Sequence, residues 1–134
     1  MTPVFPFYTA IYAALLGLLA ALLTVNVIFN RVRSKVEIGD GGVAGLAQAI
    51  RAHGNFAEQA PIALLLIALV EAFGYRSPVV QGLGGVLLVA RLLSAWGLNS
   101  SLGQTFGRQA GAGLTVLVTA VSAALILYAA IGAH

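Results

Sequence analysis

The sequence contains no cysteine, and only 8% of its 134 residues are charged. The absence of cysteine excludes disulfide bonds, thiol nucleophiles and thiolate metal ligands. The two histidines, His53 and His134, are too few to hold a metal ion without carboxylate ligands. A soluble domain usually carries charge on roughly a quarter of its residues. A chain with so few charges therefore lacks the side chains that cover a water-facing surface.

The chain has long apolar runs instead, and 60% of its residues are hydrophobic. Crossing the bilayer core as a helix takes about 20 apolar residues. Four stretches are long enough: Phe5–Phe29, Leu46–Phe73, Pro78–Leu98 and Gly111–Ile131. The short alternating segments of a β-barrel are not seen. The sequence predicts an all-α membrane protein, a four-transmembrane-helix bundle in one domain, residues 1–134, with helices near 5–29, 46–73, 78–98 and 108–131.

The basic residues predict how the bundle is oriented. Four of them would share one side of the membrane: Arg31, Arg33, Lys35 and Arg108. By the positive-inside rule that side is cytoplasmic, which places both termini outward, in the inner membrane if the protein is bacterial. Because the seven basic residues form no single long patch, no nucleic-acid partner is expected.

A polar stripe interrupts the second apolar run. Arg51, Asn55 and Glu58 are spaced at i, i+4 and i+7, which places them within about 40° of one another on one helix face. Ionisable groups at membrane depth usually face a bundle interior or a wet cavity. Pro61 follows directly and is expected to bend the helix there.

Two contacts between opposite charges are predicted, the first from depth along the helices. Arg91 and Glu58 would lie at similar depth, roughly 10–15 Å from the cytoplasmic helix ends, so we expect them to pair. Such a pair either belongs to a functional site or only locks the second helix to the third. Near the outer end, Glu71 is expected to reach toward Arg76.

The segment Ala49–Pro61, AIRAHGNFAEQAP, resembles the second-helix signature of the MAPEG family, the membrane-associated proteins in eicosanoid and glutathione metabolism. Arg31 with the later Gly39–Gly42, and the segment Arg91–Gly97, resemble the family's bacterial branch. The resemblance covers nearly the whole chain.

This resemblance implies a homotrimer in the lipid bilayer that binds glutathione, as co-substrate, between subunits on the cytoplasmic side. The candidate ligand-binding residues are Arg31, Arg33, Arg51, Asn55, Glu58 and Arg91. Arg108 corresponds to the family arginine proposed to stabilise the glutathione thiolate, which makes it the candidate catalytic residue. Arginine forks suit the two carboxylates of glutathione, and Glu58 suits its ammonium group.

Three functions remain as alternatives. The first is a glutathione transferase or peroxidase that acts on a lipophilic small molecule arriving from the bilayer. The second is a non-catalytic trimeric membrane protein that binds an amphipathic ligand or has a structural role. The third is a small multidrug transporter, which we rank last because the first apolar run lacks the carboxylate on which that class depends.

Overall fold

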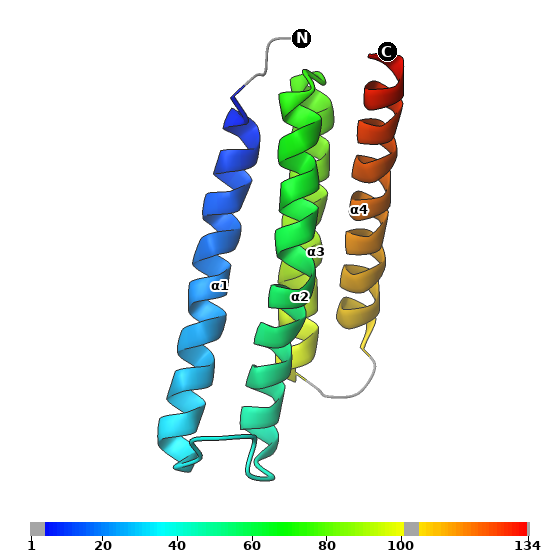
Figure 1. Cartoon of the computed structure of the whole chain (residues 1–134). Helices are drawn as coiled ribbons and strands as arrows, with labels where there is room; N and C mark the ends of the chain where they lie inside the picture. The colour runs from blue at the N-terminus through cyan, green and yellow to red at the C-terminus, as the bar shows by residue number, and fades with distance from the viewer. Residues whose placement is uncertain (1–4, 101–104, 134) are drawn as a thin grey trace.

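A computed structural model, which describes residues 5–100 and 105–133, shows four antiparallel helices (Figure 1). They are α1 (Phe7–Ser34), α2 (Ala44–Ala72), α3 (Ser77–Ser100) and α4 (Phe106–Gly132). Each is long and apolar enough to cross a membrane. The predicted all-α four-helix fold is confirmed. Residues 101–104, part of the expected link between the last two helices, lie outside the described residues, as do the chain's ends, including His134.

The first helix continues to Ser34, beyond the end expected at Phe29. It stops at Lys35, which adopts the left-handed conformation with φ 55°. The guanidinium of Arg31 then donates hydrogen bonds to the backbone carbonyls of Val36, at 3.3 Å, and Gly39, at 2.8 Å. Arg31 is therefore part of the loop that returns the chain into α2.

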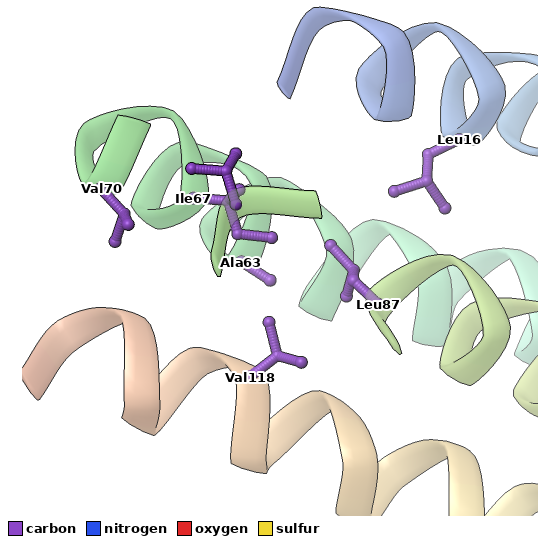
Figure 2. Close-up of a cluster of buried hydrophobic side chains, with 7 residues drawn as sticks. Leu16, Ala63, Ile67, Val70, Leu87 and Val118 are labelled. Carbon is purple, nitrogen blue, oxygen red and sulfur yellow. The ribbon is translucent and has the colours of Figure 1, made fainter. Parts of the chain in front are cut away.

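The two central helices, α2 and α3, hold the bundle together. Both pack against α1 and against α4, whereas α1 and α4 do not contact each other within the described residues. Figure 2 shows the core between them, where Leu16 of α1, Leu87 of α3 and Val118 of α4 point toward Ala63 and Ile67 of α2. Helix α2 continues through Pro61, from Ala44 to Ala72, so the bend expected at Pro61 does not interrupt the helix.

Glycines let α3 and α4 approach closely. A Cβ on Gly111 would lie 2.5 Å from the carbonyl oxygen of Ala90 and would also meet Ser94 Oγ. Gly107 lies in the same contact, with its Cβ position 3.0 Å from the carbonyl oxygen of Leu93. Small residues allow such backbone contact between membrane helices. This contact fixes the start of α4 against the end of α3.

Glu71 does not reach Arg76, so that prediction is wrong. Its carboxylate accepts hydrogen bonds from the backbone N–H groups of Tyr8 and Thr9, both at 2.8 Å, and from Thr9 Oγ1 at 2.7 Å. The first N–H groups of a helix have no partner within the helix. Within a bilayer these N–H groups have no water to bond, so the buried carboxylate of Glu71 on α2 serves as their hydrogen-bond acceptor.

Candidate functional site

The site begins with a charged pair on the outer face of α2. Arg51 and Glu58 lie two turns apart, and their side chains meet at 3.2 Å (Nη1 to Oε1) and 3.4 Å (Nη2 to Oε2). Both side chains are exposed, Arg51 at 45% and Glu58 at 59%. The helical spacing that predicted a shared face therefore produces an ion pair along one helix.

The predicted pairing of Glu58 with Arg91 is wrong, because each has a different partner. Arg91 Nη1 donates to Asn55 Oδ1 at 2.9 Å, and Nη2 donates to Ser94 Oγ at 2.9 Å. Nη2 also lies 3.3 Å from the carbonyl oxygen of Gly111. The two groups were placed at similar depth, but Arg91 points into the bundle while Glu58 points out of it.

Arg91 is the largest fully buried side chain in the part of the chain that the structure describes, with 1% exposure. Three neutral oxygen acceptors surround its guanidinium, while Nε has no partner among the described residues. Buried charge without hydrogen bonds is very unfavourable in lipid. The glycine at 111 matters here, because only a helix that approaches this closely brings its carbonyl within reach. Arg91 thus joins α2, α3 and α4 at one point.

A cavity of about 620 Å³ opens over the charged pair. Its lining comes from the loop between α1 and α2 and from one face of α2: Gly39, Asp40, Ala47, Ile50, Arg51, Gly54 and Glu58. Asp40 and Glu58 are acidic and Arg51 is basic, so the cavity presents both signs of charge. Gly54 lies beneath the pair, and a Cβ there would be 3.7 Å from Arg51 Nη1. A methyl group there would make ordinary van der Waals contact with the pair.

A second cavity, of about 420 Å³, lies between α2 and α4 and shares Glu58 with the first. Its other residues are mainly small or apolar: Gln59, Ile62, Thr115, Val116, Thr119, Ala120 and Ala123. The side-chain oxygen of Gln59 is buried and has no partner among the described residues. Glu58 therefore stands at the junction of a charged cavity and an apolar groove.

The remaining candidates lie at the same end of the bundle. Arg31 is engaged with its own loop, and Arg33 is exposed in the last turn of α1. Arg108 is half-buried in the first turn of α4, where its N–H donates to Thr105 Oγ1. Sequence reasoning missed Asp40 as a cavity residue. Gly39–Gly42 contributed to the family resemblance, but nothing in that segment indicated that the loop would fold over Arg51.

Comparison with known proteins decides the family. The sequence model of the MAPEG family matches residues 9–128. The chain belongs to the MAPEG family. It is 38% identical over 94 residues to "Inner membrane protein YecN" of Escherichia coli (strain K12) and, equally, to the protein of that name from Escherichia coli O6:H1. The match covers 70% of this chain and 72% of each relative. This MAPEG protein is an integral, multi-pass membrane protein.

Proposed function

We propose that this MAPEG protein is a homotrimer that binds glutathione, or a similar anionic amphiphile, between subunits at the cytoplasmic side. There it would act as a glutathione transferase or peroxidase toward lipophilic electrophiles. The observation that carries the proposal is the exposed ion pair of Arg51 and Glu58.

The exposed charged pair needs a cover in the membrane. Charged side chains within a membrane-spanning helix face protein or a water-filled cavity, because lipid does not solvate them. In a single chain Arg51 and Glu58 face outward, beside the apolar groove between α2 and α4. A second subunit placed against this face would shield the pair and leave the cavity as a wet chamber.

The charges of the cavity match those of glutathione. Glutathione has two carboxylates and one ammonium group, so it needs donors and acceptors of both charges. Arg51 offers a planar fork for a carboxylate, while Glu58 and Asp40 offer acceptors for the ammonium. On binding, the ligand would replace the Arg51–Glu58 contact with two contacts of its own. Arg33 of a neighbouring subunit would supply a further cation.

Arg108 and the apolar groove would serve the reaction. Arg108 would hold the glutathione sulfur as thiolate, the nucleophilic form. The sulfur would form a bond to an electrophilic carbon while the leaving group departs with its electron pair. An electrophile dissolved in the bilayer would approach along the apolar groove between α2 and α4, which Glu58 lines. Arg91 is buried, so its role would be to position Asn55 at the edge of the stripe.

Binding and turnover are tested together in lipid nanodiscs. Glutathione binding would be followed by calorimetry, and conjugation by the absorbance of the product from a chlorodinitrobenzene. Arg51→Gln and Glu58→Gln should each weaken binding at least about tenfold, since each removes a charged hydrogen-bond partner. Arg108→Gln should reduce turnover more than binding. Arg76→Gln, a cation at the opposite end of the bundle, is the matched control and should change neither.

Two results would contradict parts of the proposal. If glutathione does not bind the wild-type protein, the ligand assignment fails. If it binds but conjugation stays at the uncatalysed rate, the protein is a non-catalytic ligand-binding member instead. Native mass spectrometry in detergent tests the assembly separately, and a stable monomer would refute the trimer.

A further inference from the structure

A third cavity, of about 610 Å³, lies on another side of the bundle, between α1, α2 and α3. It shares no lining residue with the two cavities at Glu58. Its residues are Leu19, Leu22, Leu23, Asn26, Asn30, Gly45, Gln48, Leu92, Ala95 and Trp96. None of these lining residues is charged, which separates this cavity from the proposed glutathione site.

The lining changes from apolar to polar along α1. Leu19, Leu22 and Leu23 lie toward the middle of the helix, and Asn26 and Asn30 follow on the same face toward the loop end. From Leu19 to Asn30 the helix rises about 16 Å, roughly half of the hydrocarbon core. The cavity therefore has the length and polarity of one lipid leaflet, with its polar end at the α1–α2 loop.

Carboxamides form the polar end. The side-chain amide of Asn30 donates to the backbone carbonyl of Asn26 at 2.8 Å and to its side-chain oxygen at 3.1 Å. Gln48 faces them from α2 and is half-buried, yet its carboxamide has no hydrogen-bond partner among residues 5–100 and 105–133. This carboxamide is not fully enclosed, so a ligand in the cavity can reach it. Gln48 therefore has a donor and an acceptor available for a ligand.

We propose that this cavity binds an uncharged, hydroxyl-bearing lipid such as a diacylglycerol. Its acyl chain would lie along Leu19, Leu22 and Leu92, and its hydroxyl would hydrogen-bond to Gln48 and the asparagine pair. A carboxamide both donates and accepts, as a hydroxyl does. A charged headgroup would lose its hydration here and find no counter-charge in the lining. The site is independent of glutathione binding.

Trp96 makes the proposal measurable, because it is the only tryptophan in the chain and it lines this cavity. Bromine atoms on an acyl chain quench tryptophan fluorescence at contact. The protein would be placed in nanodiscs of unbrominated phosphatidylcholine, and two brominated lipids would be titrated in. Brominated diacylglycerol and brominated phosphatidic acid share the same chains and glycerol and differ by the charged phosphate.

Brominated diacylglycerol is expected to quench Trp96 saturably. Its half-maximal quenching should come at a mole fraction about fivefold lower than that of phosphatidic acid, which is the difference that one net hydrogen bond gives. Gln48→Leu and Asn26→Leu should each abolish that preference. Gln81→Leu removes an exposed amide from the other end of α3, and it should preserve the preference. Equal quenching by both lipids, no quenching by either, or a preference that survives both amide substitutions would overturn the proposal. If a variant fails to fold, the comparison of the two brominated lipids on the wild-type protein still tests the proposal.

Discussion

Arg91 of α3 donates a 2.9 Å hydrogen bond to the side-chain oxygen of Asn55 on α2. The same guanidinium bonds Ser94 and approaches the backbone of α4 at Gly111. Asn55 is one turn from Arg51 and just under one turn from Glu58 on their helix face. The hydrogen bond therefore connects a buried cation in the core to the charged stripe at the surface, and it fixes how α2 is rotated relative to α3.

This contact predicts a measurable coupling between the two residues. Asn55→Ala leaves Arg91 with one acceptor fewer in a site that water does not reach. The free energy of unfolding should fall by about 1.5–3 kcal/mol, the range for hydrogen bonds to charged groups. Denaturant unfolding of the purified protein in micelles would measure it. With Arg91→Met in the background, the effect of Asn55→Ala should shrink by more than about 0.5 kcal/mol.

The cycle of Glu58→Ala with Arg91→Met is the control. Because Glu58 pairs with Arg51 instead, those two substitutions should be additive within about 0.5 kcal/mol. A larger coupling for Glu58 than for Asn55 would mean that Arg91 pairs with the carboxylate after all.

Glu71 should act as a clamp on the start of α1. Its carboxylate receives three hydrogen bonds from Tyr8 and Thr9, and an ionised carboxylate accepts all of them without offering a donor. In Glu71→Gln the amide group would oppose one of these donors, so we expect a loss of about 1–3 kcal/mol in unfolding free energy. Hydrogen exchange should accelerate at Tyr8 and Thr9 before the rest of α1. Glu37→Gln, in the exposed loop, should have neither effect.

Gly111 and Gly113 offer a matched pair on one helix. Gly111→Ala would place a methyl group against Ala90 and Ser94, so it should destabilise the protein by about 1–3 kcal/mol. Apart from the adjoining residues and the backbone of α4 itself, no heavy atom of the described residues lies within 4 Å of a Cβ position at Gly113. Gly113→Ala should therefore be neutral or stabilising by up to about 1 kcal/mol, the helix propensity difference. Equal effects in the unfolding midpoint would show that α3 and α4 do not pack closely here.

The fold could be predicted because length and hydropathy decide it. Four apolar runs separated by short polar links leave few arrangements other than an antiparallel bundle. The shared face of Arg51 and Glu58 was also predictable, since helical spacing is local. What spacing does not give is the rotation of one helix against another. Arg91 and Glu58 match in depth, but α3 turns Arg91 toward Asn55 and away from the outer face of α2.

The start of α1 shows a second limit of sequence reasoning. Glu71 and Arg76 are close in sequence, and a surface ion pair was the simplest expectation. The competing partners are N–H groups more than sixty residues away, at Tyr8 and Thr9. No local pattern marks them, because any helix start has unpaired N–H groups. Only the packing of α1 against α2 brings the carboxylate to them.

The orientation of the bundle is still a prediction, and the absence of cysteine makes it simple to test. Single cysteines can be introduced at Glu37, in the loop between α1 and α2, and at Arg76, between α2 and α3. The loop end carries most of the basic residues, so it should be cytoplasmic. If the protein is expressed in a bacterial inner membrane, Arg76→Cys should react with a membrane-impermeant maleimide in intact spheroplasts. Glu37→Cys should react only after lysis, and the reverse pattern would place the proposed glutathione site on the outer side.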